Sequence, residues 1–252
     1  PAQVDRVLGA ADGALLRAVY DVKPGGNFEG RSILHLHRSL EAEAAARKTP
    51  AKPFAARMRA ALDKLDVERR KRTPPLLDDK VITAWNGLMI GSLAYAGMQL
   101  GEPTWTGAAA EAASWILAHM RTKDGRLLRI ARGDKARVAG VLDDYAFFIS
   151  GVLDLFEATG RARWLAAALE LQRMQDRLFL DKAAGGYFAT ASDAAPLLAR
   201  EKPAYDGARP CGNSIAAMNL VRLGALTGDR NWTNRARRTL WAFAGRLQRA
   251  PR

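Results

Sequence analysis

Three segments of this chain repeat one layout, and this internal repetition limits the possible folds more than any other feature. In each segment, polar residues precede a long apolar run that ends at a glycine, and a tryptophan follows four residues after that glycine. The glycines are Gly101, Gly160 and Gly228, and the tryptophans are Trp105, Trp164 and Trp232. The repeat is longer than that of the common helical solenoids. It is typical of long pairs of antiparallel helices.

Each apolar run is predicted to be a helix, with Asp or Asn near its start and Gly at its end. The runs carry very few charged residues: none in 84–101, Asp154 and Glu157 in 145–160, and Arg222 in 213–228. The segment after each tryptophan carries many more. A helix that is apolar around most of its circumference is buried, whereas an amphipathic helix faces water. Each repeat is therefore predicted to pair an inner helix with an outer one.

Repeated helical hairpins predict an all-α fold, either an α/α solenoid or a closed α/α toroid. The toroid is favoured because such apolar inner helices need cover on nearly every side. Residues 2–19 and 54–71 are also predicted helices, joined by an irregular segment around 25–27, which makes roughly eight long helices in all. The sequence shows no strand-rich domain and no clean domain boundary. We therefore expect residues 1–252 to form a single toroid domain or part of one.

Composition excludes several classes of protein. Hydrophobic residues make up 48% of the chain and charged residues 26%, which is ordinary for a globular protein and excludes disorder. The longest weakly charged stretch, 85–101, is shorter than the roughly 20 apolar residues that a membrane span requires. No signal-peptide pattern opens the sequence, and the single cysteine, Cys211, permits no internal disulfide. These features predict a cytoplasmic protein without membrane contact.

The net charge of +13 raises the possibility of nucleic-acid binding, because clustered Lys and Arg neutralise phosphates. The charges concentrate in 68–72 and 229–252, and both segments have helical periodicity. No RNA-binding aromatic motif, zinc pattern or helix-turn-helix accompanies them. Solvated helix faces are the favoured interpretation, and nucleic-acid binding is the minor alternative.

If the inner helices are parallel, their N-terminal ends gather at one end of the structure together with the polar residues there. Carboxylates can act there as acid, base or nucleophile on a sugar, aromatic rings can stack on it, and amide and ammonium groups can bind its hydroxyls. The candidate catalytic residues are Asp78, Asp79, Asp143 and Asp144. The candidate substrate-binding residues are Lys80, Trp85, Asn86, Tyr145, Asp206 and Asn213.

The competing interpretation of these aspartates is helix capping, which contributes about 1 kcal/mol per cap. The doubling of Asp at 78–79 and 143–144 favours an additional role, since a cap needs only one. Other candidate sites are weaker. His35 and His37 have the alternate spacing of a strand, and Cys211 has no apparent base nearby. We therefore expect no metal site, no catalytic thiol and no cofactor.

The segment 72–90, RTPPLLDDKVITAWNGLMI, resembles a signature of the spermatogenesis-associated protein 20-like family, also called thioredoxin-domain-containing proteins. Further stretches agree in order at 26–30, 142–146 and 206–214. The resemblance implies a six-hairpin (α/α)6 toroid related to glycosidases and to N-acylglucosamine 2-epimerase. It also implies a pocket of the carbohydrate-binding type, without naming a substrate.

Two departures from the family pattern matter. The family has Ser where this chain has Cys211, which argues against an essential thiol. The family's N-terminal thioredoxin-like domain is absent, and roughly eight helices cannot make six hairpins. The resemblance thus implies a fragment with an incomplete ring. Apolar edges left exposed by such a ring predict self-association or a partner chain that completes it.

Two functional hypotheses follow. The first is an enzyme that acts on a sugar or polyol by epimerisation or hydrolysis through the inner-helix aspartates. Isomerases of this architecture commonly use a His base, and neither His35 nor His37 lies at an inner-helix start, which favours carboxylate chemistry. The second is a non-catalytic binding or scaffold module that accompanies a thioredoxin-like domain.

Overall fold

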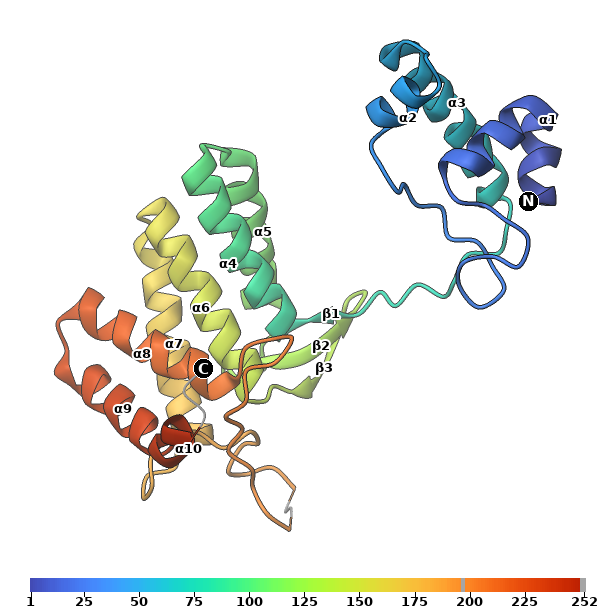
Figure 1. The fold of residues 1–252 in the computed structure, drawn as a ribbon. Helices are drawn as coiled ribbons and strands as arrows, with labels where there is room; N and C mark the ends of the chain where they lie inside the picture. The colour runs from blue at the N-terminus through green and yellow to red at the C-terminus, as the bar shows by residue number, and fades with distance from the viewer. Residues whose placement is uncertain (196–197, 250–252) are drawn as a thin grey trace. The chain divides into compact units, whose positions relative to one another are not determined.

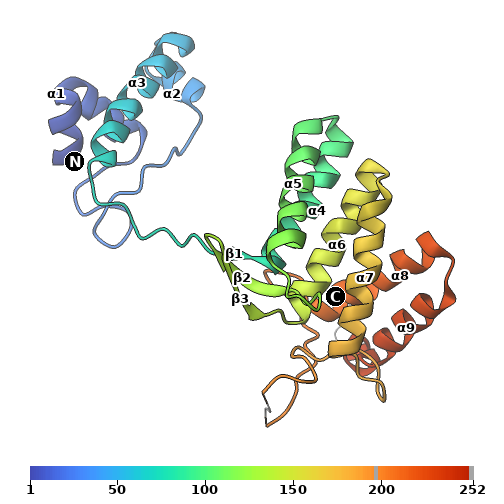
Figure 2. The same cartoon turned by 180° about the vertical axis from the view of Figure 1, so that it is seen from behind.

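The computed structural model describes residues 1–195 and 198–249. The chain forms two compact units, Pro1–Leu77 and Asp78–Arg252, which are described separately (Figures 1 and 2). The division follows Pro74 and Pro75, in backbone without regular secondary structure. No helix among the described residues combines the length and the apolarity needed to cross a membrane.

The first unit contains three helices, α1 (Ala2–Val19), α2 (Leu40–Ala46) and α3 (Ala51–Arg70). Both long helices predicted here are confirmed. The core includes Leu16 from α1 and Met58 from α3, both fully buried. The segment between α1 and α2 is irregular, and its path is set by Asn27, whose side chain bonds the backbone N–H and C=O of Ile33 at 2.7 and 2.9 Å.

The second unit consists mainly of three helical hairpins. The inner helices are α4 (Thr83–Leu100), α6 (Leu142–Thr159) and α8 (Gly212–Thr227), and the outer helices are α5 (Pro103–His119), α7 (Ala162–Phe179) and α9 (Arg230–Trp241). A short α10 (Ala244–Arg249) follows. Each inner helix ends at a left-handed glycine, Gly101, Gly160 or Gly228. The predicted repeat is confirmed.

A small antiparallel sheet connects the first two hairpins, with strands β1 (Val81–Ile82), β2 (Leu128–Arg132) and β3 (Lys135–Ala139) in the order β1-β2-β3. Val81 pairs with Ala131, so the sheet joins the residues before α4 to the connection that follows α5. The sequence did not predict these strands. The fold is therefore mostly helical rather than purely helical.

Helix α6 is the centre of the second unit and packs against α4, α7 and α8. Phe147, Phe148 and Val152 are fully buried. The α4–α6 crossing is close, because a Cβ added at Gly151 would lie 2.4 Å from the carbonyl oxygen of Gly87. The flanking inner helices expose apolar side chains instead: Trp85, Met89 and Tyr95 on α4, and Met218 and Val221 on α8.

Candidate functional site

The N-terminal ends of the three inner helices meet, as the repeat predicts (Figure 1). Asp144 in the first turn of α6 accepts a hydrogen bond from the backbone N–H of Ala84 in α4 at 3.0 Å. The neighbouring Asp143 lies against the start of α8, since a Cβ added at Gly212 would be 2.5 Å from its Oδ1. The first turn of α6 therefore joins the starts of the other two inner helices.

Asp144 is fully buried, and both oxygens of its carboxylate accept hydrogen bonds from other residues of the chain. Besides the bond from Ala84, its Oδ2 accepts hydrogen bonds from the backbone N–H of Val141 at 2.9 Å and from Nη1 of Arg129 at 3.0 Å. Burial raises the pKa of Asp144, and the bonds from Val141 and Arg129 oppose that rise. Asp144 therefore caps α6 and also links α4 to α6 through its hydrogen bonds.

Asp143 has a different environment although it is the adjacent residue. Its side chain is 18% exposed and forms an ion pair with Arg209, which belongs to the loop before α8 and is itself more than half exposed. Both partners are accessible to a small molecule. Asp143 therefore places a partly exposed carboxylate, paired with an arginine, at the point where the inner helices converge.

Asp78, Asp79 and Lys80 lie further from the helix starts than the sequence implied. These three residues directly precede β1. Because β1 pairs with β2, they lie beside the sheet. Asp79 forms an ion pair with Nε of Arg132 at 2.5 Å, and Asp78 one with Lys80 at 3.0 Å. The hydrogen bond from Lys80 lowers the pKa of Asp78. Both carboxylates are more than half exposed, and neither caps α4.

Asp206 organises the start of α8. Its Oδ1 accepts the backbone N–H of Cys211 at 2.7 Å, and its Oδ2 accepts the hydroxyl of Ser214 at 2.9 Å. The residue itself is exposed. Asp206 therefore holds the preceding loop, which carries Arg209, against the helix terminus.

Two of the predicted binding residues are buried. The Asn213 side chain accepts the backbone N–H of Tyr187 at 2.7 Å and donates to the carbonyls of Tyr187 and Pro203. The Tyr145 hydroxyl accepts the backbone N–H of Leu127 at 2.9 Å, and burial raises its pKa. The half-buried Asn86 donates to the carbonyl of Ile82. These three side chains hold loops and helix starts in place.

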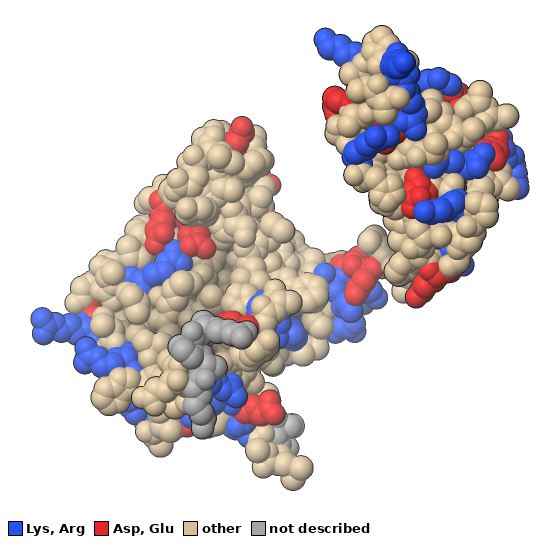
Figure 3. All heavy atoms as spheres, in the orientation of Figure 1, with Lys and Arg blue, Asp and Glu red and all other residues tan. Residues whose placement is uncertain are grey.

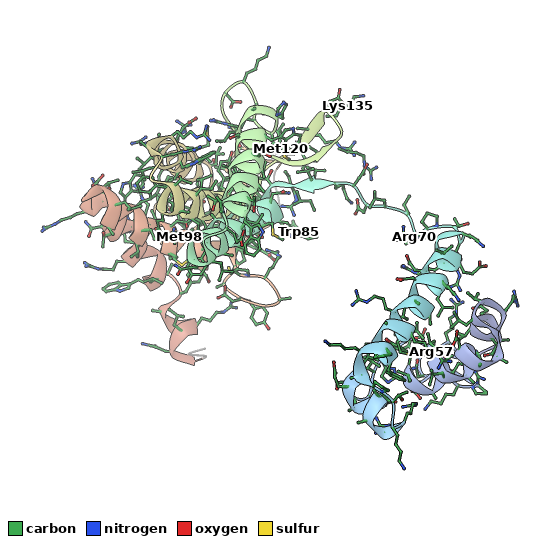
Figure 4. All side chains as sticks on the ribbon, turned by 90° about the horizontal axis from the view of Figure 1, so that it is seen from above. Arg57, Arg70, Trp85, Met98, Met120 and Lys135 are labelled. Atoms are coloured by element: carbon green, nitrogen blue, oxygen red, sulfur yellow. The ribbon has the colours of Figure 1, made fainter. Side chains whose placement is uncertain are left out.

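Trp85 is the exposed aromatic residue of the predicted set. Its relative exposure is 61%, and Met89, one turn further along α4, is exposed to a similar degree. Figure 4 shows Trp85 near the N-terminal end of α4. An exposed indole next to a thioether forms an apolar surface of the kind on which a sugar ring can stack.

Several arginines that pair with these aspartates were not predicted. Arg129 and Arg132 come from β2, where Leu128 and Ile130 are apolar and Gly133-Asp134 follows. This alternation and turn were the signal for the hairpin. Arg222 was visible as the only charge of its apolar run, and it pairs with Asp154 at 2.7 Å. Burial raises the pKa of Asp154.

Charge on the surface is mixed. On the face shown in Figure 3, Lys and Arg are interspersed with Asp and Glu rather than gathered into one continuous basic patch. Many arginines take part in ion pairs with nearby carboxylates, including Arg126 with Asp193 and Arg235 with Asp176. The positive net charge is thus distributed over helix faces and loops.

Solved structures with the same kind of fold include sugar-processing enzymes. Cellobiose 2-epimerase from Spirochaeta thermophila DSM 6192 superposes with a TM-score of 0.54 at 15% identity, over 66% of this chain and 43% of that one. An inactive variant of the α-1,6-mannanase GH76A of Salegentibacter sp. HEL1_6, in complex with α-1,6-mannotetrose, superposes with a TM-score of 0.51 at 9% identity, over 96% and 69%. Two consecutive aspartates are replaced by alanine in that variant. The mostly helical structure is similar in fold to six-hairpin glycosidase-like (α/α)6 toroid enzymes.

No model of a known protein family matches the chain. Spermatogenesis-associated protein 20 of Homo sapiens is 37% identical over 238 residues, which are 90% of this chain and 30% of that protein. The mouse protein of the same name matches over the same shares. The chain thus spans about 30% of the length of these curated relatives. Over that part, it is homologous to spermatogenesis-associated protein 20.

Proposed function

We propose that the second unit binds a sugar or polyol at the converging starts of α4, α6 and α8 and acts on it by carboxylate acid/base chemistry. The observation that carries this proposal is the division of roles between two adjacent aspartates. Asp144 is buried and fully bonded, so the frame of the site is rigid. Asp143 is partly exposed in its ion pair with Arg209, so a ligand that displaces the arginine meets this carboxylate.

The remaining candidates take supporting roles. Trp85 supplies the stacking surface, and Asp206 positions the loop that carries Arg209. Asp78 and Asp79 are the nearest exposed carboxylates in the sequence before α4, and Lys80 follows them. One of these carboxyls would serve as the second acid/base group, because both glycoside hydrolysis and epimerisation need a proton donor and a proton acceptor.

The structural neighbours support a carbohydrate ligand and suggest the first compounds to test. One neighbour is a cellobiose 2-epimerase and another an α-1,6-mannanase in complex with a mannose tetrasaccharide. The mannanase variant that is described as inactive lacks two consecutive aspartates, and this chain has two such pairs. Hydrolysis is favoured over epimerisation here, because the helix starts present carboxylates and no histidine among the described residues.

A scaffold role is the second candidate, and a specific observation favours it. The carboxylates of Asp79 and Asp143 are paired with arginines, and that of Asp78 with a lysine. In a scaffold, these ion pairs would hold loops and would never exchange partners with a ligand.

The test compares Asp143→Asn and Trp85→Ala with the control Asp134→Asn, which changes an exposed aspartate in the β2–β3 turn. Binding of α-1,6-mannotetraose and cellobiose would be measured by calorimetry, and product formation by chromatography and NMR. We expect turnover of at least one sugar, a loss of about 100-fold or more in kcat for Asp143→Asn, weaker binding for Trp85→Ala, and no change for Asp134→Asn. Turnover that survives in Asp143→Asn, or the absence of sugar binding, would refute the enzyme proposal and leave the scaffold.

A further inference from the structure

The first unit brings two histidines and an aspartate to one point. Nε2 of His37 lies 3.6 Å from Oδ2 of Asp21, and Nε2 of His35 lies 3.8 Å from the same oxygen. The two imidazole rings are 4.5 Å apart between centroids and meet edge to face. One ligand-type atom from each of the three residues lies within 4.8 Å of the other two.

The local backbone explains why these residues meet. Asp21 follows α1 in the left-handed region, with φ of 54°, which turns the chain sharply at the helix end. Asn27 then holds both backbone groups of Ile33, so the segment after it returns towards α1. His35 and His37 are two residues apart in backbone without regular secondary structure, and the side chains of both reach Asp21.

The distances argue against a simple hydrogen-bonded cluster. Both histidine nitrogens are farther from Asp21 Oδ2 than a hydrogen bond allows, so the three groups surround a common centre without bonding one another. In a tetrahedral zinc site, ligand atoms at about 2.0–2.2 Å from the ion lie about 3.3–3.6 Å from each other. The two observed N···O distances require only a small contraction to reach that geometry.

The neighbouring groups suit a metal site as well. Nδ1 of His35 lies 3.3 Å from the carbonyl oxygen of Ile33 and 3.2 Å from Nδ2 of Asn27. In the tautomer whose Nδ1 proton bonds the Ile33 carbonyl, Nε2 is the electron-pair donor that faces Asp21. Lys23 binds Oδ1 of Asp21 at 2.8 Å, which leaves Oδ2 for the ion. Lys23 is more than half exposed and can move away from an incoming cation.

We propose that Asp21, His35 and His37 bind a divalent transition-metal ion, for which zinc is the best match. Two imidazoles and one carboxylate form a ligand set that suits Zn²⁺, Co²⁺ and Ni²⁺ rather than Mg²⁺ or Ca²⁺, which prefer oxygen ligands. The His35 and His37 side chains are 42% and 66% exposed. The site therefore opens to solvent, and water completes the coordination of the ion.

The experiment is a calorimetric titration of the full 252-residue chain with Zn²⁺, together with a Co²⁺ titration followed by visible absorption. We expect one ion per chain, the absorption bands of Co²⁺ bound through nitrogen and oxygen, and no heat with Mg²⁺. His37→Ala is the main variant, because among the described residues the polar contact of the His37 side chain is with Asp21. His37→Ala and Asp21→Asn should each weaken Zn²⁺ binding by more than about tenfold.

The control is His119→Ala, which removes a histidine that stacks on Trp115 in the second unit. This variant should bind Zn²⁺ as the unchanged chain does. Circular dichroism would show that each variant keeps its helix content. Zn²⁺ binding that survives in His37→Ala, that falls equally in His119→Ala, or that is absent from the unchanged chain would overturn the proposal.

Discussion

The two units of the chain are built by different means. In the second unit, three hairpins repeat one set of local signals, and the close α4–α6 crossing at Gly87 and Gly151 places α6 at the centre of a continuous core. In the first unit, a smaller core joins α1 to α3, and a single side chain, Asn27, directs the long segment between helices. Repetition specifies a fold through many equivalent local choices, whereas an irregular unit depends on individual side chains.

The units also differ in the polar groups that they bury. The second unit buries Asp144 and Asn219, which bond backbone groups near the starts of α4 and α6, and Asn213, which bonds the backbone of Tyr187 in the loop after α7. In the first unit, the buried charged residue Glu43 is paired with Arg38 and Arg47. The second unit therefore depends strongly on a few buried hydrogen bonds, because an unpaired buried group is costly.

The largest expected effect is that of Asp144→Ala. The change leaves the N–H groups of Ala84 and Val141 unpaired and removes the partner of Arg129. We expect a loss of about 3–5 kcal/mol in the free energy of unfolding, measured by urea denaturation. The matched control is Asp143→Ala, whose ion pair is partly exposed and which should cost about 1 kcal/mol or less. Equal losses would contradict the distinction between the two aspartates.

Leu16→Ala tests the core of the first unit. Leu16 is fully buried, and we expect its truncation to cost about 2–5 kcal/mol through lost burial and a cavity. Hydrogen exchange should show the loss in α1 and α3 and unchanged protection in α6. Leu76→Ala, at a fully exposed leucine, should change nothing. Reduced protection of α6 in Leu16→Ala would break the comparison, since the two cores would then unfold as one.

Gly151→Ala tests whether close backbone contact defines the second unit. The added Cβ would meet the carbonyl oxygen of Gly87 at 2.4 Å, so the helices must separate, at a cost of about 1–3 kcal/mol. Gly107→Ala on α5 meets no atom within 4 Å, and higher helix propensity should stabilise it by up to about 1 kcal/mol. Thermal unfolding of both variants checks the pair. We expect Gly151→Ala to lower the melting temperature and Gly107→Ala to raise it. Stabilisation by Gly151→Ala would show that the α4–α6 crossing is not closely packed.

The repeat explains why the helices could be predicted, whereas strand β1 and its pairing with β2 could not. Apolar runs, glycine ends and charged outer helices are local signals, so α4, α6 and α8 were found close to their true limits. Strand β1 has two residues, and its pairing of Val81 with Ala131 is a long-range contact. No local sequence pattern predicts such a pairing. The positions of Asp78 and Asp79 depend on this pairing, so they could not be predicted either.

The candidate site could be predicted in its location but not in the role of each residue. Parallel inner helices follow from repetition, so the meeting of their N-terminal ends was predictable. The difference between Asp143 and Asp144 was not, because the rotation of α6 against α4 determines which carboxylate is buried. The proximity of Asp21 to His35 and His37 was also missed, because it requires the turn after α1 and the bonds of Asn27.

The smallest expected effect concerns an irregular turn of the second unit. Asp181 accepts hydrogen bonds from Lys202 at 2.8 Å and from the backbone N–H groups of Ala183 and Ala184. The bond from Lys202 is the main cause that lowers the pKa of Asp181 to about 2 from its ordinary 3.8. A carboxyl with a lowered pKa in the folded state stabilises the fold above its unfolded pKa, and this contribution is lost as the pH falls through the folded value.

Asp181→Asn keeps an oxygen for the two backbone donors and removes the charge. We expect the variant to melt below the unchanged chain at neutral pH, with a gap that narrows from about pH 5 and closes near pH 2. Melting temperatures of both proteins between pH 2 and 7 would show this. A gap that persists at pH 2 would mean that Asp181 acts by its shape alone. A gap in melting temperature that closes at low pH would show that the charge of Asp181 stabilises this turn. The turn would then depend on an individual polar side chain, as the segment directed by Asn27 does in the first unit.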